Sequence, residues 1–201
     1  MEHYFISKQH SKDDYFQFDW KFFDMEFSFK SCDDVFSKDN VDYGTYVLLK
    51  TIKEKLVICG DVLDIGCGYG PIGIVLDKIF IDQNLSITMS DFNQTAVELA
   101  KQNVIKNHCK NIRDVVLSNA YKNINGSFDF IISNPPIKAG KKVLLDILLG
   151  SYEKLNAGGK LVFVIKKKFG EDSIKKQLSQ IFASVEVLER DSGYYILQAT
   201  K

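Results

Sequence analysis

From residue 61 onward, short runs of apolar residues alternate with longer segments in which apolar residues recur every three or four positions. A short apolar run is typical of a buried strand, and the wider spacing is typical of a helix with one buried face. Asn93 precedes one of these segments and is a suitable N-cap. The pattern predicts strands at 61–66, 85–91, 112–119, 127–134 and 160–168, and helices at 71–80, 93–107, 141–155 and 172–182.

The end of the chain follows a different pattern. Segments 184–190 and 193–201 are separated only by Asp191 and Ser192, and so short a connection permits only an antiparallel hairpin. The prediction is then seven strands, six alternating with helices and one that turns back. This favours an α/β fold with a doubly wound, mostly parallel sheet that helices cover on both faces.

The first sixty residues carry another pattern. Aromatic and polar residues alternate over 16–32, which predicts a β-hairpin with its turn at Phe23–Asp24. The apolar stripe over 35–52 predicts a helix, and Gly158 and Gly159 are expected to stop the helix before them. The hairpin is expected either to pack on the sheet edge or to cover an active site. We predict a single domain over 1–201, with an N-terminal extension at 1–55 and an α/β core at 56–201.

Composition narrows the function classes. Lys+Arg and Asp+Glu are both 26, so a nucleic-acid partner would have to be held by a local basic patch. The four cysteines form no C-x-x-C pair, which argues against a metal site and for reduced thiols in a cytoplasmic protein. No run of about 18 apolar residues is present, so no membrane span is expected.

A glycine-rich loop stands between the first core strand and its helix. Gly66, Gly68 and Gly70 let the backbone turn tightly and let a ligand approach closely. The next strand ends in Asp91, about 20 residues later, a distance at which an acidic side chain can accept hydrogen bonds from ribose hydroxyls. Pro71 occupies a position where a pyrophosphate-binding loop would use a backbone donor, which favours a nucleoside cofactor other than NAD.

The stretch "DFIISNPPIKAG" (129–140) ends a strand at two prolines. Pro135 and Pro136 fix two φ angles and remove two backbone donors, and the residue before a proline is driven toward extended geometry. The sequence therefore predicts a stiff corner that presents the amide side chain of Asn134.

With these features, the chain resembles the class I S-adenosylmethionine-dependent methyltransferases. The resemblance rests on "LDIGCGYGPIG", an acidic second-strand end and "NPPI" after the fourth strand. The further segments "VFS…D-x-GT" (35–45), "NPPIKAGKK" (134–142) and "GYYI" resemble the small-domain methyltransferases, relatives of the bacterial enzymes that methylate guanine N2 in 16S ribosomal RNA. This resemblance implies a Rossmann-like methyltransferase fold and S-adenosyl-L-methionine as cofactor.

The resemblance also assigns roles to residues. Asn134 Oδ1 and the Pro135 carbonyl would accept the two N–H groups of an exocyclic amine and aim its lone pair at the methyl group. Asn134, Pro135 and Pro136 would thus form the catalytic corner. The implied cofactor-binding residues are Asp64, which supports the loop, Gly66, Gly68 and Gly70 around the methionine and ribose, Asp91 at the ribose, Asn119 at the adenine, and Asn134.

On the substrate side, Ile137 stands where many such enzymes carry an aromatic residue that stacks on the target base. Phe36 or Tyr43 could supply that stack instead. Several lysines follow the ends of two neighbouring strands and are expected to contact RNA phosphates: Lys138, Lys141, Lys142 and Lys166–Lys168.

The sequence favours an RNA N-methyltransferase acting on guanine N2 of small-subunit ribosomal RNA. The same corner suits adenine N6 of DNA or RNA, or a protein glutamine amide. An inactive cofactor-fold binding domain is a third hypothesis, and an NAD enzyme a distant fourth. The sequence leaves open whether the protein is a monomer or a homodimer, and whether it acts on naked RNA or on an assembling subunit.

Overall fold

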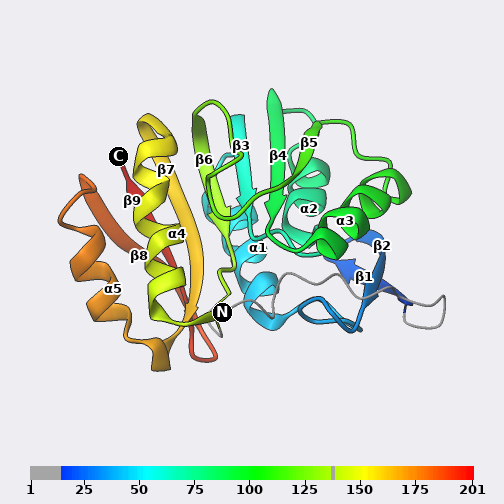
Figure 1. Ribbon diagram of the computed structural model, residues 1–201, viewed down its shortest axis with the longest axis horizontal. Helices are drawn as coiled ribbons and strands as arrows, with labels where there is room; N and C mark the ends of the chain where they lie inside the picture. Colours follow the sequence, from blue (N-terminus) through cyan, green and yellow to red (C-terminus); the bar gives the residue numbers. More distant parts are fainter. Residues whose placement is uncertain (1–14, 137–138) are drawn as a thin grey trace.

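A computed structural model describes residues 15–136 and 139–201 of the chain. Its main sheet has seven strands in the order β5-β4-β3-β6-β7-β9-β8 (Figure 1). Neighbours among β3 to β7 pair in parallel, whereas β9 is antiparallel to both β7 and β8. The predicted seven-stranded, mostly parallel fold is therefore confirmed. The strands are β3 (Gly60–Ile65), β4 (Leu85–Asp91), β5 (Ile112–Leu117), β6 (Phe128–Ser133), β7 (Leu155–Lys166), β8 (Ser184–Asp191) and β9 (Tyr194–Thr200).

Helices cover both faces of the sheet because successive strand residues point to opposite faces. Val62 and Ile132 belong to the core under α1, α2 and α3, whereas Leu63 and Ile131 belong to the core under α4 and α5. Burial on both faces explains why the strands appear in the sequence as nearly continuous apolar runs. The helices are α1 (Tyr43–Lys55), α2 (Pro71–Ile79), α3 (Gln94–Lys106), α4 (Lys141–Lys154) and α5 (Glu171–Leu178).

Helix α1 begins at Tyr43, so the prediction of a helix from residue 35 is wrong. The Asp42 carboxylate accepts the N–H groups of Gly44 at 2.9 Å and Thr45 at 3.3 Å, which is the bonding of an N-cap. Ser37, upstream of this cap, has a φ of 60° that a helix does not allow. The segment before α1 is consequently a series of turns.

The predicted helix stop at Gly158 and Gly159 is also wrong. Helix α4 ends at Lys154, and Leu155 is already extended and begins β7. Gly158 has a φ of 76°, and the pairing of β6 with β7 shifts register between Phe128 and Phe130. The glycines therefore accommodate an irregularity in a long strand. At its other end, β7 gives way to a short 3₁₀ helix, η3 (Lys167–Phe169).

The N-terminal hairpin consists of β1 (Tyr15–Phe22) and β2 (Met25–Cys32), with the predicted turn between them. It forms a sheet of its own and packs on α3, so it does not lie on the edge of the main sheet (Figure 1). The rings of Phe18 and Phe29 contact Tyr69 of the glycine-rich loop, with centroids 6.0 and 5.5 Å away. The hairpin therefore packs against the side of the loop that carries the Tyr69 ring.

Asn103 of α3 joins the hairpin to the loop. Its side chain is fully buried. Oδ1 accepts the Lys30 N–H at 2.8 Å, and Nδ2 donates to the carbonyls of Lys30 and Tyr69, both at 2.8 Å. One side chain thus satisfies three backbone groups from two separate segments.

Among the described helices, none has the length and apolar character that crossing a membrane would require. Within residues 15–136 and 139–201, no group of three or more His, Cys, Asp or Glu side chains is arranged to hold a metal ion.

We predict that Asn103→Ala lowers the free energy of unfolding by roughly 3 kcal/mol, because it leaves several backbone groups without partners. Urea denaturation measures this loss. Gln102→Ala is the matched control, since Gln102 precedes Asn103 on the same helix and its side chain accepts a hydrogen bond from the exposed Lys30 ammonium at 3.1 Å. Equal losses in the two variants would contradict the bridging role.

Candidate functional site

The glycine-rich loop connects β3 to α2 and leaves open backbone at its tip. The N–H groups of Gly66 and Cys67 both donate to the Ser90 carbonyl, at 2.8 and 2.9 Å, which ties the loop to the end of β4. Gly68 has a φ of 57°, and no heavy atom lies within 4 Å of the position that its Cβ would occupy. A ligand can therefore lie directly against the loop at Gly68.

Asp91 connects this loop to the start of α3. Its carboxylate accepts the Gly68 N–H through Oδ2 and the Asn93 N–H through Oδ1, both at 2.9 Å. A carboxylate has about four acceptor sites, so both oxygens retain the capacity to bind hydroxyl groups. The Ser118 N–H donates to the Asp91 carbonyl at 2.8 Å, which places the exposed Asn119 beside it.

Asp64 lies beneath the loop and is fully buried. Its Oδ2 accepts the Gly73 N–H at 2.9 Å, while Oδ1 has no hydrogen-bond partner. Burial raises the pKa of the Asp64 carboxyl to about 7, and the neighbouring charge of Asp91 adds to the shift. A buried carboxylate oxygen without a partner is costly unless a donor or cation approaches it.

Gly70 has a packing requirement of its own. Its φ is 100°, and a Cβ there would come within 2.7 Å of Met89 and 3.1 Å of Ile74. The absence of a side chain lets α2 begin close against β4. Its predicted contact with a cofactor stays a prediction.

Asn134 at the end of β6 is held by the start of α1. Its Nδ2 donates to Thr45 Oγ1 at 2.9 Å and to Asp42 Oδ2 at 3.2 Å. Because a carboxylate can only accept, Asp42 fixes the amide nitrogen on its own side. The acceptor Oδ1 of Asn134 consequently faces away from α1.

The corner and the glycine-rich loop are neighbours. The Ser133 hydroxyl donates to the Ile65 carbonyl at 2.7 Å, joining the ends of β6 and β3. The Cβ position of Gly66 lies 4.0 Å from Pro136 Cδ. Residues that the sequence singled out in three different segments thus meet at the carboxyl edge of the sheet, where ligands of such sheets bind.

Comparison with known proteins agrees with this arrangement. A sequence model of the methyltransferase small domain matches residues 26–198. The chain belongs to the methyltransferase small-domain family. The match begins inside the N-terminal hairpin and ends in β9, so it includes the glycine-rich loop and the corner. S-adenosyl-L-methionine is accordingly its cofactor.

Two relatives illustrate the range of similarity. The uncharacterized protein YbxB of Bacillus subtilis is 39% identical over all of this chain and 98% of its own length. Ribosomal RNA small subunit methyltransferase C of Serratia proteamaculans is 35% identical over 85% of this chain. This chain covers only 48% of the length of that relative, so it corresponds to about half of the longer protein.

Solved structures support the fold. The T. thermophilus 16S rRNA methyltransferase RsmC, in complex with AdoMet and guanosine, superposes with a TM-score of 0.81 at 22% identity. The match covers 93% of this chain and 50% of that one. A methyltransferase from Pyrococcus furiosus gives a TM-score of 0.67, also at 22% identity. At these identities the likeness concerns the fold.

The residues present fit S-adenosyl-L-methionine. Oδ1 of Asp64 has no hydrogen-bond donor. The ammonium group of the cofactor is a donor that would satisfy it. The open face at Gly68 provides space for close approach, and Asp91 retains acceptor capacity for hydroxyl groups. No metal ligand is needed for this set of contacts.

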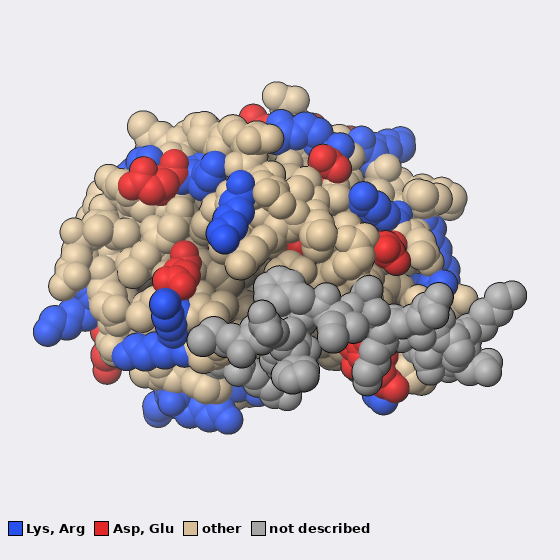
Figure 2. Space-filling model, in the orientation of Figure 1, with Lys and Arg blue, Asp and Glu red and all other residues tan. Residues whose placement is uncertain are grey.

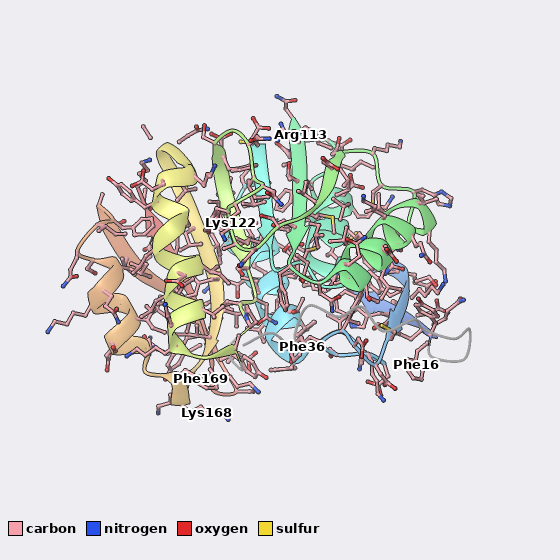
Figure 3. All side chains as sticks on the ribbon, viewed as in Figure 1. Phe16, Phe36, Arg113, Lys122, Lys168 and Phe169 are labelled. Carbon is pink, nitrogen blue, oxygen red and sulfur yellow. The ribbon has the colours of Figure 1, made fainter. Side chains whose placement is uncertain are left out.

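Of the predicted substrate residues, Phe36 and Lys141 lie at the same edge. Phe36 is 61% exposed in the turns before α1, and Lys141 begins α4 and reaches Ser173 Oγ at 3.3 Å. Figure 3 shows Phe36, Lys168 and Phe169 along this edge and Arg113 at the opposite one. Ile137 and Lys138 lie outside the described residues. The substrate contacts of all of them remain predictions.

Tyr43 is turned toward the β8–β9 hairpin. Its hydroxyl donates to Asp191 Oδ1 at 3.1 Å, and its ring packs against Tyr194 with centroids 5.7 Å apart. A hydrogen bond with Tyr194, and more weakly the charge of Asp42, raise the pKa of Lys166 at the end of β7. Tyr194 thus packs against Gly44 at the start of α1, and the Lys166 ammonium lies 4.9 Å from the centroid of its ring.

Sequence reasoning did not find the residues that orient Asn134. Asp42 and Thr45 were noted only within the family-like segment "D-x-GT". Their role depends on a contact between residues about 90 positions apart, which no local pattern reveals. The only local signal at Asp42 is that an acidic residue stands directly before a helix. That signal indicates an N-cap and says nothing about Asn134.

The buried Asp64 predicts a pH-dependent stability of the cofactor-free methyltransferase. Its pKa is raised to about 7 in the folded protein, against 3.8 for the ordinary carboxyl. Between these values the unfolded chain has already released the proton that the folded chain keeps, so stability falls as pH rises. As pH rises through this interval, the urea midpoint of the wild type should fall, and that of Asp64→Asn should change less.

Asp61→Asn serves as the control because it removes an exposed carboxylate from the same strand. A pH profile of Asp64→Asn that matches the wild type would show that another group titrates.

Proposed function

We propose that this methyltransferase transfers the methyl group of S-adenosyl-L-methionine to the exocyclic N2 amine of a guanine in small-subunit ribosomal RNA. The observation that carries the proposal is the Asn134 amide. Its nitrogen is held by Asp42 and Thr45, so its oxygen is available beside the glycine-rich loop.

The chemistry requires an acceptor at this point. The lone pair of an exocyclic amine is delocalised into the ring, so the nitrogen is a weak nucleophile. Two acceptors that bind its two N–H groups would direct the lone pair toward the methyl group. Asn134 Oδ1 and the Pro135 carbonyl supply them, and the rigid prolines fix their separation.

Proton removal follows the transfer. Asn134 is neutral and cannot act as a useful base, so its contribution is positioning and stabilisation of the charge that develops on nitrogen. The proton leaves to water after the carbon–nitrogen bond forms and the carbon–sulfur bond breaks. In this mechanism Asn134 is a catalytic residue, whereas Asp42 and Thr45 are positioning residues.

The cofactor contacts are part of the proposal. Asp91 binds the ribose hydroxyls, Gly66 and Gly68 lie against the methionine and ribose, and Asp64 receives a donor at its free oxygen. Asn119, next to Ser118 at the end of β5, faces the adenine. The roles of Gly68, Asp91 and Asp64 are supported by the open face of the loop and the remaining acceptor sites of the two carboxylates.

RNA as substrate is supported by the relatives and by local charge. The relatives named as ribosomal RNA small subunit methyltransferase C are 33–36% identical to this chain over most of its length. Although the net charge is zero, Lys141 and Lys168 lie at the carboxyl edge of the sheet. Figure 2 shows basic atoms grouped at the lower left, over the starts of α4 and α5.

Transfer of a tritiated methyl group to different acceptors tests the substrate class. The acceptors are small ribosomal subunits, naked ribosomal RNA, DNA and release factors, each incubated with the intact chain. We expect label in RNA, at guanine N2 after nuclease digestion. Label at adenine N6 or in a protein glutamine would replace the proposed substrate by one of the two alternatives that the corner also suits.

We predict that Asn134→Ala lowers the rate of methyl transfer roughly 10²- to 10³-fold, because one preorganised acceptor is lost. Single-turnover assays at saturating cofactor give the rate, and calorimetry measures any change in cofactor affinity separately. Asn156→Ala is the matched control, since that amide bonds Asp129 at 2.8 Å at the other edge of the sheet. Near-normal transfer by Asn134→Ala would refute the role of the corner.

We also predict that Thr45→Val lowers kcat about tenfold, because the Asn134 amide loses its 2.9 Å partner and is held only by the 3.2 Å bond to Asp42. Thr45→Ser keeps the hydroxyl and should restore the rate. Cofactor affinity and urea midpoints distinguish positioning from unfolding. If Val and Ser variants had the same kcat, the hydroxyl would have no positioning function.

A further inference from the structure

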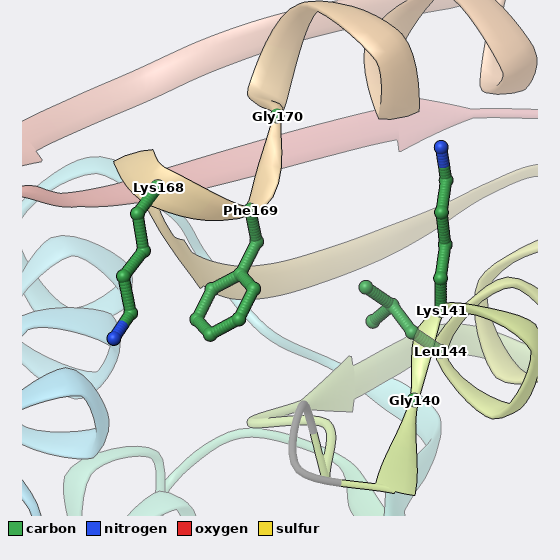
Figure 4. A pocket seen from close by; sticks show the side chains of 6 residues that line it. All are labelled: Gly140, Lys141, Leu144, Lys168, Phe169 and Gly170. Carbon is green, nitrogen blue, oxygen red and sulfur yellow. The ribbon is translucent and has the colours of Figure 1, made fainter.

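A pocket of about 470 Å³ lies between the starts of α4 and α5, outside the catalytic corner. This volume is within the range of small-molecule sites, roughly 300–1,000 Å³. It is lined by Gly140, Lys141, Leu144, Lys168, Phe169 and Gly170 (Figure 4).

The pocket opens on the same edge as Asn134. Its first wall, α4, follows the end of β6, and its second wall, η3, follows the end of β7. Because β6 and β7 are parallel neighbours, both walls start from the edge where the corner lies. A strand of RNA whose target base reaches Asn134 would therefore pass close to this pocket.

An aromatic ring and an apolar side chain face each other in the pocket. Figure 4 shows Phe169 pointing into it, with Leu144 on the opposite side. Phe169 is 37% exposed, whereas Leu144 is buried and forms a fixed wall. The Lys168 ammonium lies 5.2 Å from the centroid of the Phe169 ring and holds it from one side. The flat face of a base could insert between this ring and Leu144.

Two positive charges flank this slot. Lys141 stands in the first turn of α4, where a cation is opposed by the helix dipole and where no acidic residue compensates it. Within the described part of the chain, neither Lys141 nor Lys168 takes part in an ion pair. The nearby Glu171 is directed to Arg190 at 3.6 Å. The ammonium groups are thus available for phosphates.

Glycines keep the mouth of the pocket open. Gly140 has a φ of 98° and no heavy atom within 4 Å of its Cβ position, and the nearest atom to that position in Gly170 is Ser173 Cβ at 3.8 Å. Neither rim therefore narrows the entrance. Stacking on an aromatic ring combined with basic side chains is how proteins hold single-stranded nucleic acid.

We propose that this pocket is a second nucleotide site, which takes a base of the RNA strand near the one presented to Asn134. The base stacks on Phe169 opposite Leu144, and Lys141 and Lys168 contact the flanking phosphates. This inference rests on the proposed RNA substrate and deepens it. It locates substrate affinity outside the catalytic corner, in residues that do not touch the reacting atoms.

The test is binding of a fluorescein-labelled, single-stranded RNA of about eight nucleotides, measured by anisotropy with the intact chain and without cofactor. Phe169→Ala should weaken binding between about fivefold and about a hundredfold. Phe169→Trp should keep the affinity, and Phe169→Leu should lose most of it. A comparable loss in Phe169→Leu and Phe169→Trp would overturn the stacking role.

Phe23→Ala is the matched control for the ring. Phe23 is also an exposed phenylalanine, 45% accessible, with the Lys53 ammonium 5.3 Å from its ring centroid, but it lies at the hairpin turn. It should bind RNA like the wild type. An equal loss in Phe23→Ala and Phe169→Ala would overturn the proposal.

The lysines are tested by salt dependence. Lys141→Ala and Lys168→Ala should each reduce the slope of log affinity against log salt by about 0.7, the value for one single-strand phosphate contact. Lys110→Ala removes an exposed lysine at the opposite edge and should leave the slope unchanged. Unchanged slopes in the two pocket variants would contradict the phosphate contacts.

Cross-linking places the RNA directly. The same oligonucleotide carrying 4-thiouridine should cross-link to the η3 and α4 segments around Phe169, as mapped by mass spectrometry. Cross-links confined to other segments, or none, would overturn the site while leaving RNA methylation through Asn134 intact. Conversely, RNA bound at Phe169 together with methyl transfer to a protein would refute the proposed function and leave the nucleotide site standing.

Discussion

A single carboxylate oxygen, Asp42 Oδ2, connects the start of a helix to Asn134 at the end of β6. It accepts the N–H groups of Gly44 and Thr45 and, from the other side, the Asn134 amide. The point at which α1 begins therefore determines which way the amide faces. The glycine-rich loop meets this corner where the Cβ position of Gly66 lies 4.0 Å from Pro136 Cδ. Moving the start of α1 by one residue would disturb all of these relations.

The parallel sheet explains why residues from distant segments converge. In a sheet of this type the ends of β3, β4, β6 and β7 open on one edge, and each end carries a different component. The ends of β3 and β4 carry the cofactor loop and Asp91, the end of β6 carries Asn134, and the end of β7 carries the basic segment with Phe169. Under the proposed function, cofactor, target base and flanking strand would therefore lie side by side along this edge.

Local signals in the sequence were reliable where the physical cause was local. The Asn93 cap, the glycine turn and the hairpin turn each depend on neighbouring residues, and the structure has all three. The start of α1 was misplaced because the apolar stripe continued upstream of a cap that only Asp42 marks. The Asn103 bridge and the Asn134 clamp join residues that are 73 and 92 positions apart, so no periodicity could reveal them.

The position of β9 has a consequence for how the protein is made. Strand β8 precedes β9 in the chain, yet β8 joins the sheet only through β9, which lies between it and β7. During synthesis from the amino end, β8 must wait outside the sheet until its successor has left the ribosome. Tyr194, which packs against Gly44 beside Asp42, arrives with that successor. A nascent chain can therefore expose the glycine-rich loop for some seconds before Tyr194 packs beside Gly44.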